Sequence, residues 1–237
     1  MPGNATPRVP GRRPGSAAAG LAAAALLLLS AGCGGGPRPV LGGSGARAAG
    51  TPVAAPSLPG DWHGTATVGT VRRPSFTLTD TDGRRFDFAQ ATAGHATLLF
   101  FGYTHCPDVC PTTMADLAVA RQVVGSAVAA KVTVVFVTTD PARDTPAVLA
   151  RWLRQFDARF IGLTGTSAQV AAAQRAVGVP VALADPDGAG PDGAGYLVGH
   201  AAQVLGIGPD DRVHVRWFAD TTVAEYVADV PRLAAAV

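Results

Sequence analysis

Residues 97–111 read TLLFFGYTHCPDVCP and decide the fold, because an apolar run passes directly into a turn and a helix start. The apolar and aromatic run from Thr97 to Tyr103 is typical of a central strand that is buried on both faces of a sheet. Pro111 suits the first turn of a helix, where its missing N–H has no partner to lose. The stretch therefore predicts a strand, a turn and a helix in succession.

Strands and helices also alternate on either side of this stretch. Two short segments of period-two character flank the turn DTDG at residues 80–83, which predicts a hairpin. We expect further strands over Val132–Thr138, Phe160–Leu163, Val204–Ile207 and Val213–Phe218, and we expect the last two to pair antiparallel. We expect helices over Pro111–Val128, from Thr145 to Phe156, over Ser167–Val177 and after Thr222. A Gly/Pro/Asp-rich loop follows the helix over Ser167–Val177. This order resembles a thioredoxin-like layout, an α/β fold with a central mixed sheet flanked by helices.

The composition argues against several classes of protein. A hydrophobic fraction of 48% argues against a mainly disordered chain, and a net charge of +2 over 237 residues argues against a nucleic-acid-binding surface. Three cysteines are too few for a small disulfide scaffold. We therefore expect a globular domain whose chemistry comes from a local cluster of residues.

The beginning of the chain has the features of an export signal. Arg8, Arg12 and Arg13 precede an uncharged run rich in Ala and Leu, which ends in the sequence LSAGC at Cys33. This ending resembles the lipobox of bacterial lipoproteins, although Ser30 stands where the strict pattern prefers Leu. A retained transmembrane anchor is the alternative, but the run is shorter than the roughly 20 residues that a span needs.

These features divide the chain into three parts. We expect a lipoprotein signal peptide over residues 1–32, a lipid-anchored flexible linker over 33–60 and the folded domain over 61–237. The linker is mostly Gly, Pro and Ala, and it cannot bury enough apolar surface to offset its ordering entropy. A lipid on Cys33 would hold a monomeric, soluble domain at the outer face of the bacterial cytoplasmic membrane.

Cys106 and Cys110 lie where the buried strand ends and the helix begins, the usual place for a site in an open α/β sheet. If the helix has begun by Cys106, the two side chains share one face, and the helix N-terminus lowers the pKa of nearby thiols. Two such thiolates can close a disulfide, or they can bind a soft metal such as Cu(I), Cu(II) or Zn(II) together with an imidazole. A purely structural disulfide is less favoured, because so short a loop constrains the unfolded chain little.

The sequence FFGYTHCPDVCP at residues 100–111 resembles the signature of the Sco/SenC family of copper-binding assembly proteins. The sequence VTTDPARDTP at residues 137–146 resembles a second stretch of that family, and His200 in YLVGH matches its lone downstream histidine. The combination is specific, because thioredoxins carry CxxC rather than CxxxC and peroxiredoxins lack the paired cysteines at this turn. The resemblance covers the chain from Pro74 to Val237.

The resemblance implies a copper site, for Cu(I) or Cu(II), made of the Cys106 and Cys110 thiolates and the His200 imidazole. Family members usually carry an acidic residue just before this histidine and hydroxyl residues after it. Here Gly199 precedes it and residues 201–202 are both Ala, so the groups that usually orient the imidazole differ in this chain.

Other polar residues near these motifs have different expected roles. Asp140 matches a family aspartate near the site, which implies a supporting or redox-coupling role, and a turn residue before Pro141 is the alternative. His105 adjoins Cys106, but we expect it to pack or to form a hydrogen bond at the strand end. We interpret the other three histidines as structural or surface residues: His63, His95 and His214.

Two functions follow from this pattern. The resemblance implies a copper metallochaperone that delivers copper to the dinuclear copper centre of subunit II of cytochrome c oxidase. The alternative is a membrane-tethered thiol–disulfide oxidoreductase that keeps the cysteines of that copper site reduced, one thiolate attacking and the other resolving. Redox exchange does not require His200, so its presence favours the metal, and enzymatic activity is a secondary expectation.

Overall fold

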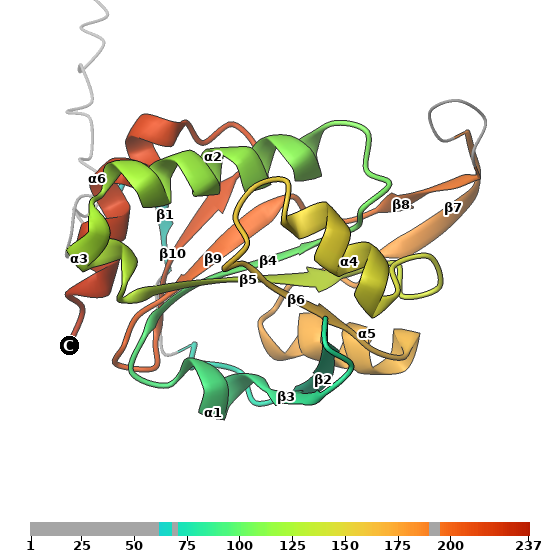
Figure 1. Cartoon of the computed structure of the whole chain (residues 1–237), viewed down its shortest axis with the longest axis horizontal. Coiled ribbons are helices and arrows are strands. Elements are labelled where there is room, and N and C mark those ends of the chain that lie inside the picture. Colours follow the sequence, from blue (N-terminus) through green and yellow to red (C-terminus); the bar gives the residue numbers. More distant parts are fainter. Residues whose placement is uncertain (1–61, 68–70, 190–194) are drawn as a thin grey trace, which may run out of the picture. The chain divides into compact units, whose positions relative to one another are not determined.

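The computed structural model describes residues 62–67, 71–189 and 195–237, and its central strand is the one expected from the sequence. Strand β4 (Ala96–Gly102) lies in an eight-stranded mixed sheet of order β1-β10-β9-β4-β5-β6-β2-β3 (Figure 1). It pairs in parallel with β5 (Val132–Thr138) and antiparallel with β9 (Gln203–Ile207). All seven residues of β4 are buried, which explains why its sequence shows no polar alternation.

The remaining strands extend the sheet to both edges. Strand β6 (Ile161–Thr164) pairs in parallel with β5, and beyond it lies the predicted hairpin of β2 (Thr77–Asp80) and β3 (Arg85–Asp87). On the other side, β9 pairs antiparallel with β10 (Val213–Phe218), as predicted, and β10 pairs with the short β1 (Thr65–Ala66).

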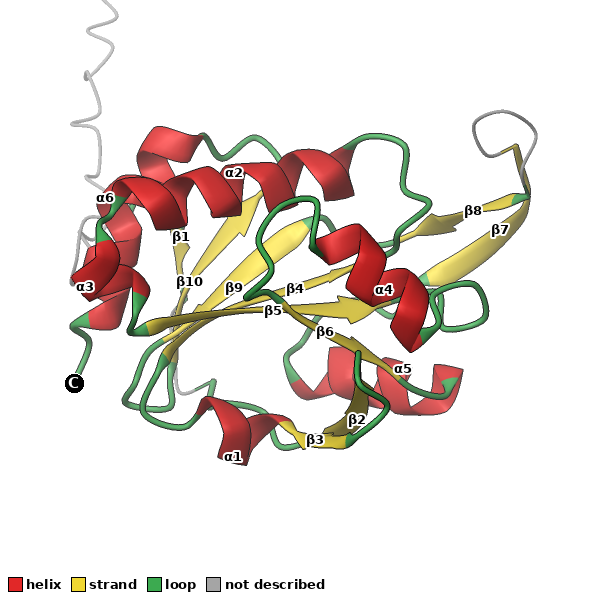
Figure 2. Ribbon diagram, viewed as in Figure 1, coloured by secondary structure: helices red, strands yellow, loops and turns green. Residues whose placement is uncertain are grey.

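Helices cover both faces of the sheet (Figure 2). Helices α2 (Val109–Val123), α4 (Pro146–Leu153) and α6 (Val223–Ala234) lie on one face, and α1 (Phe88–Thr92) and α5 (Ser167–Ala176) lie on the other. Each face has its own hydrophobic cluster. Neighbouring residues of β4 point to opposite clusters, because side chains alternate along a strand. The predicted α/β, thioredoxin-like fold is therefore confirmed.

The helix expected from Pro111 to Val128 is two helices, so this prediction was wrong. Helix α2 ends at Val123, and a separate α3 spans Ser126–Ala129. Gly125 lies between them with φ of 83°, a left-handed conformation that ends the helix and that glycine adopts without strain. Helix α4 likewise ends at Leu153, before the expected limit at Phe156.

The segment expected to be a loop after α5 forms a second, two-stranded sheet. Strands β7 (Leu183–Ala189) and β8 (Tyr196–Gly199) pair antiparallel with each other and stand apart from the main sheet. Gly, Pro and Asp are rare inside strands, which is why the sequence of β7 gave no strand signal. This hairpin leads directly to His200.

The predicted signal peptide, Cys33 and the predicted linker all lie outside the described residues. Within the part of the chain that is described, no helix has the length and apolar character needed to cross a membrane.

A buried carboxylate attaches the first described residues to the last helix. Asp229 of α6 is 1% exposed, and it accepts hydrogen bonds from the backbone N–H groups of His63 at 3.0 Å and Gly64 at 3.1 Å. Trp217, which is fully buried in β10, donates its Nε1–H to the same carboxylate at 2.8 Å. A carboxylate can be buried here because these donors replace the water that it loses.

We predict that Asp229→Ala lowers the free energy of unfolding by about 3 kcal/mol, since Trp217 keeps a buried N–H without its charged acceptor. Urea denaturation followed by tryptophan fluorescence measures this change. The matched control is Asp220→Ala at an exposed position, which should change the same quantity by no more than about 0.5 kcal/mol. Equal losses in the two variants would show that the Asp229 bonds contribute little.

Candidate metal centre

The turn between β4 and α2 brings two sulfur atoms to the end of the central strand. Cys106 lies within this turn, and Cys110 is the second residue of α2, which begins at Val109. The backbone N–H of Cys110 donates to Cys106 Sγ at 3.5 Å, and the N–H of Cys106 donates to the carbonyl of Tyr103 at 3.2 Å. The two cysteines therefore do not share a helix face, because Cys106 precedes the helix; the tight turn brings them together instead.

Gly102, the last residue of β4, makes room for one of these sulfurs. A Cβ at this position would lie 2.7 Å from Cys110 Sγ and 3.0 Å from ring atoms of Phe100 and Phe136. The contact with sulfur is shorter than real Cβ atoms make, and the contacts with the rings are tighter than most, so a side chain here would displace its neighbours. Glycine therefore allows the Cys110 sulfur to pack directly against the strand.

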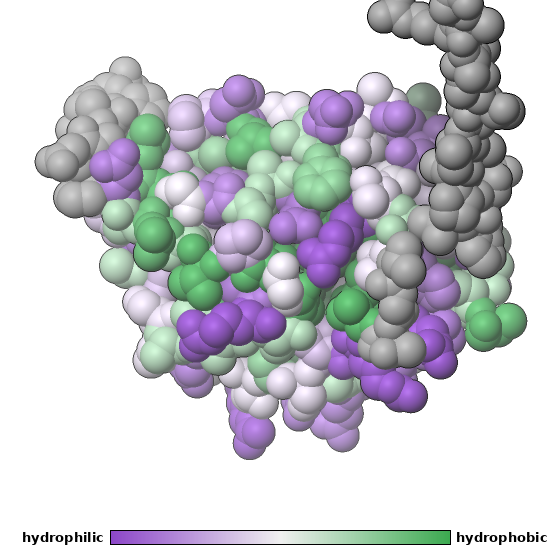
Figure 3. Space-filling model, turned by 180° about the vertical axis from the view of Figure 1, so that it is seen from behind, coloured by the Kyte–Doolittle hydropathy of each residue, from purple (hydrophilic) through white to green (hydrophobic). Residues whose placement is uncertain are grey.

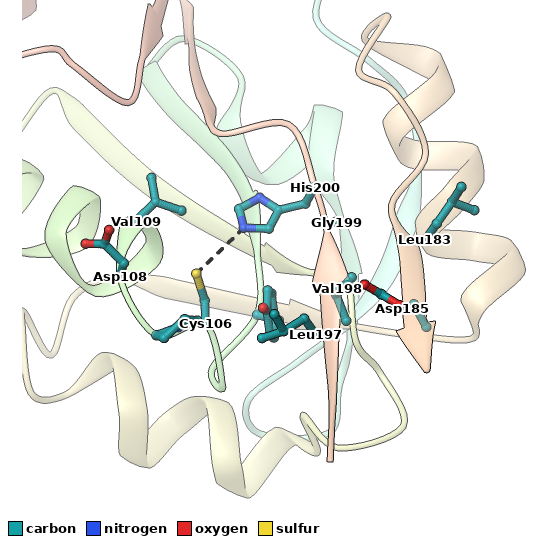
Figure 4. A pocket seen from close by; sticks show the side chains of 12 residues that line it. Cys106, Asp108, Val109, Leu183, Asp185, Leu197, Val198, Gly199 and His200 are labelled. Atoms are coloured by element: carbon teal, nitrogen blue, oxygen red, sulfur yellow. Dashed lines mark hydrogen bonds between the residues drawn. The ribbon is translucent and has the colours of Figure 1, made fainter. Parts of the chain in front are cut away.

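His200 reaches the same point from a distant part of the chain. It follows β8, 90 residues beyond Cys110, and its Nε2 lies 3.3 Å from Cys110 Sγ and 3.8 Å from Cys106 Sγ. The three candidate ligand atoms all lie within 4.8 Å of one another. Figure 4 shows Cys106 and His200 facing each other across this gap. The structure thus brings together the three residues that the sequence singled out.

Aromatic packing holds the imidazole of His200. Its ring meets those of Tyr103 and Phe100 edge-on, with centroid distances of 5.5 Å and 6.1 Å. Its Nδ1 is buried and has no hydrogen-bond partner among the described residues. Ligand histidines usually donate this second N–H to a carboxylate or a carbonyl. Here aromatic packing, rather than a hydrogen bond at Nδ1, supports the side of the ring that faces away from the sulfurs.

The two thiols differ in burial and in protonation. Cys110 is fully buried and Cys106 is 9% exposed, and both are free. A hydrogen bond from Cys110, together with a weaker one from His200, lowers the pKa of Cys106 to about 4. Burial raises the pKa of Cys110 above its usual range. In the metal-free pair, the hydrogen bond from Cys110 thus favours negative charge on Cys106 over negative charge on the more deeply buried Cys110.

A second buried carboxylate fixes the turn that carries Cys106. Asp144 is 0% exposed, and its Oδ2 accepts from the backbone N–H of Thr104 at 2.9 Å and from the hydroxyl of Thr138 at 2.6 Å. The Thr104 hydroxyl donates to Oδ1 at 2.5 Å. His105 also faces this carboxylate, with its Nδ1 3.7 Å from Asp144 Oδ1. This role of Asp144 could not be inferred from the sequence, because its partners lie up to 40 residues away.

Asp140 attaches the hairpin that leads to His200 to the rest of the domain. It is 3% exposed and accepts hydrogen bonds from Arg143 Nε and, at 2.7 Å, from the hydroxyl of Tyr196. The Arg143 guanidinium also lies over the Tyr196 ring, 3.8 Å from its centre. Tyr196 begins β8, the strand that ends beside His200. These contacts attach the hairpin to the end of β5, and nothing in the sequence pointed to Tyr196.

The donor atoms determine which ions this centre suits. Two soft sulfurs and one borderline imidazole nitrogen are a ligand set typical of Cu(I), Cu(II) and Zn(II). Three protein ligands leave a coordination position open to another molecule. Within the described part of the chain, no other group of three such side chains is close enough to hold an ion.

Known proteins share this sequence pattern. A family model described as SCO1/SenC matches residues 65–235. The bovine (Bos taurus) protein SCO2 homolog, mitochondrial, is 33% identical over 166 residues, which cover 68% of this chain. The match covers 59% of the bovine protein, so the chain spans about three fifths of that relative's length.

Solved structures share the fold. The structure of Bradyrhizobium japonicum ScoI with copper bound is 34% identical, with a TM-score of 0.59 over 69% of this chain and 99% of that one. The crystal structure of yeast Sco1 with copper bound is 27% identical, with a TM-score of 0.62 over 71% of this chain and 91% of that one.

We predict that Gly102→Ala lowers the affinity for Cu(I) at least tenfold, because the new methyl group displaces the Cys110 sulfur. Competition with a chromogenic Cu(I) chelator measures this affinity. Gly206→Ala in β9 is the matched control, since its Cβ would be equally crowded, 2.6 Å from Val215, but lies against no sulfur. Similar affinity losses in both variants would trace the effect to general destabilisation.

Proposed function

The chain belongs to the SCO1/SenC family, and from that membership we propose that it binds one copper ion through the thiolates of Cys106 and Cys110 and the imidazole of His200. The observation that carries this proposal is the convergence of two thiol sulfurs and one imidazole nitrogen, all within 4.8 Å of one another. The similar proteins of Bradyrhizobium japonicum and yeast have been solved with copper bound. Copper is the cargo of this site, and the chain supplies the ligands.

The function best supported is that of a copper metallochaperone. The family is associated with cytochrome c oxidase assembly, and we propose subunit II of that oxidase, with its dinuclear copper centre, as the acceptor. A chaperone must hold its cargo firmly and still release it. A centre with three ligands and an open position allows an incoming thiolate to replace the protein's ligands one at a time.

A thiol–disulfide oxidoreductase is the second candidate, favoured by the pairing of a thiolate with a thiol. The Cys106 thiolate would attack a disulfide of a client protein, forming a mixed disulfide and releasing one client thiolate. Cys110 would pass its proton to the client thiolate released in the first step and attack Cys106 Sγ, which closes the Cys106–Cys110 disulfide and releases the second client thiolate. Two electrons pass to the client, which is thereby reduced.

His200→Ala separates the two candidates. We predict that this variant loses the thiolate-to-copper absorption bands and lowers Cu(II) affinity by more than the ~10–100-fold that loss of a supporting group costs. It should still form the Cys106–Cys110 disulfide at nearly the wild-type rate. Titration with Cu(II), followed by absorption and metal analysis, measures the first effect, and thiol counting measures the second.

Two further variants complete this experiment. His105→Ala should keep the copper bands, because that ring faces Asp144 rather than the sulfurs. Cys106→Ser should lose both copper binding and disulfide formation. Rapid thiol oxidation without retained copper, identical in wild type and His200→Ala, would establish the oxidoreductase instead.

We propose that a lipid on Cys33 tethers the domain, through the linker over residues 33–60, to the outer face of the cytoplasmic membrane. The support is the order of charge, apolar run and small residues before Cys33. We predict that protein extracted from bacterial membranes begins at Cys33 and carries a diacylglyceryl mass there. Mass spectrometry checks this, Cys33→Ala is the control that should keep its leader, and an unmodified Cys33 would refute the anchor.

A further inference from the structure

Between α5 and β9 the chain stands outside the main sheet, and His200 lies in this part of it (Figure 1). We call it the hairpin segment, because it carries β7 and β8. Its base consists of Val177, the residue that ends α5, and Gln203, the first residue of β9. The way in which the segment leaves and re-enters the domain at this base therefore affects where His200 lies.

Two hollows flank the hairpin. A cleft of about 700 Å³ lies between the hairpin and the turn that leads into α2, and Cys106 and His200 line it (Figure 4). A second hollow of about 240 Å³ lies between the hairpin, α5 and the loop that follows β5. Apolar side chains gather near the hairpin on the face seen in Figure 3, and apolar contacts have no preferred direction. The position of the hairpin therefore depends on its hydrogen bonds, which include those of Tyr196 and those at the base.

Arg216 of β10 joins the two ends of the base. Its Nη2 donates to the carbonyl of Val177 at 2.7 Å, and its Nη1 donates to Gln203 Oε1 at 2.9 Å. The backbone N–H of Gln203 in turn donates to the carbonyl of Ala201 at 2.9 Å, and Ala201 directly follows His200. Because a guanidinium is planar and its donors are fixed relative to each other, Arg216 holds the start and the end of the hairpin segment in one arrangement.

Burial makes these two hydrogen bonds important to keep. It lowers the pKa of Arg216, because the charged form loses part of its water. A cation that is partly withdrawn from water needs acceptors in place of that water. The Val177 carbonyl and the Gln203 amide supply them, so the cation and the base of the segment stabilise each other.

Gln174 of α5 strengthens the same base. Its side chain is buried, with 1% of the residue exposed. Its Nε2 donates to the carbonyl of Pro180 at 3.0 Å, and its Oε1 accepts the backbone N–H of Ala182 at 3.2 Å. Both partners lie just before β7, so the beginning of the segment is attached to α5 as well as to β10.

We propose that Arg216 is a positioning residue of the metal centre: by joining Val177 to Gln203, it holds the hairpin segment so that His200 Nε2 lies beside the two cysteine sulfurs. Its effect on copper rests on the proposed function, whereas its effect on the hairpin segment does not. The simpler alternative is that Arg216 only caps α5, because Val177 is the C-cap of that helix and a cation is favourable there. The two roles give different results.

The test replaces Arg216 by Met in the full chain, which keeps an apolar stem and removes both hydrogen bonds. We expect the affinity for Cu(I) to fall about tenfold, the lower end of the range for groups that support a ligand histidine, because Arg216 acts at one remove. The thiolate-to-copper absorption bands of the Cu(II) form should shift as well. Arg216→Lys keeps the charge and an N–H donor and should lose less affinity. Competition with a chromogenic chelator measures the affinity.

Arg121→Met is the matched control. Arg121 also joins a backbone carbonyl to a side-chain oxygen, those of Ala129 and Asp157, both at 3.1 Å, but it does so in the last turn of α2. This variant should bind Cu(I) as tightly as the wild type. Equal losses of affinity in the Arg121 and Arg216 variants would trace the effect to general destabilisation and overturn the proposal.

A double variant shows whether Arg216 acts through His200. In a protein that already carries His200→Ala, the Arg216→Met change should alter the Cu(I) affinity by less than about twofold, because two changes that act through one group are not additive. A further tenfold loss in that background would show that Arg216 acts by another route, and it would overturn the proposal.

Hydrogen exchange of the metal-free protein tests the positioning without copper. In Arg216→Met, the backbone amides of β8 should exchange at least about tenfold faster than in the wild type, whereas those of α2 should not change. Faster exchange confined to α5 would show that Arg216 only caps that helix, and it would overturn the proposal. Faster exchange in β8, together with a wild type that binds no copper, would refute the proposed copper function and still support the positioning of the hairpin segment by Arg216.

Discussion

The buried carboxylate of Asp144 is the constraint on which the cysteine half of the site depends. A carboxylate with no exposed surface is unfavourable unless donors replace its water. Thr104 supplies a backbone N–H and a hydroxyl, and Thr138 supplies a second hydroxyl. These donors belong to the ends of β4 and β5, so the charge can be satisfied only when the two strand ends lie side by side. The position of Cys106, two residues beyond Thr104, follows from that requirement.

The loop after β5 also holds the hairpin that positions His200. A two-stranded hairpin is only marginally stable alone, and β7–β8 stands outside the main sheet. Asp140 and Arg143 hold it through Tyr196. The carbonyl of Asp140 also accepts the backbone N–H groups of Arg143 and Asp144, at 3.2 Å and 2.9 Å. A single tight turn therefore carries both carboxylates, and it fixes the cysteines and the histidine relative to each other.

The sequence predicted those features that depend on residues close to each other along the chain. The apolar run of β4 and the helix starts at Thr145 and after Thr222 were predicted, because each signal acts within a few residues. The three candidate ligands were found through a family resemblance, not through spacing alone.

The supporting contacts were not predictable in this way. Thr104 and Asp144 lie 40 residues apart, and Asp140 and Tyr196 lie 56 residues apart. Only the folded chain brings them together. The hairpin was missed for a related reason: Gly, Pro and Asp disfavour a strand locally, and contacts from the rest of the domain overcome that preference.

The same geometry makes the three candidate ligands unequal, which bears on release of a bound ion. Cys110 packs against Gly102 at the end of β4 and has no exposed surface. Cys106 precedes the helix and lines the cleft, and the ring of His200 packs against aromatic edges without a hydrogen bond at Nδ1. An incoming thiolate from the cleft would therefore meet Cys106 and His200 before Cys110, because only those two of the three candidate ligands line the cleft. Cys110, which packs against the end of β4, would be the last of the three that an incoming group could reach.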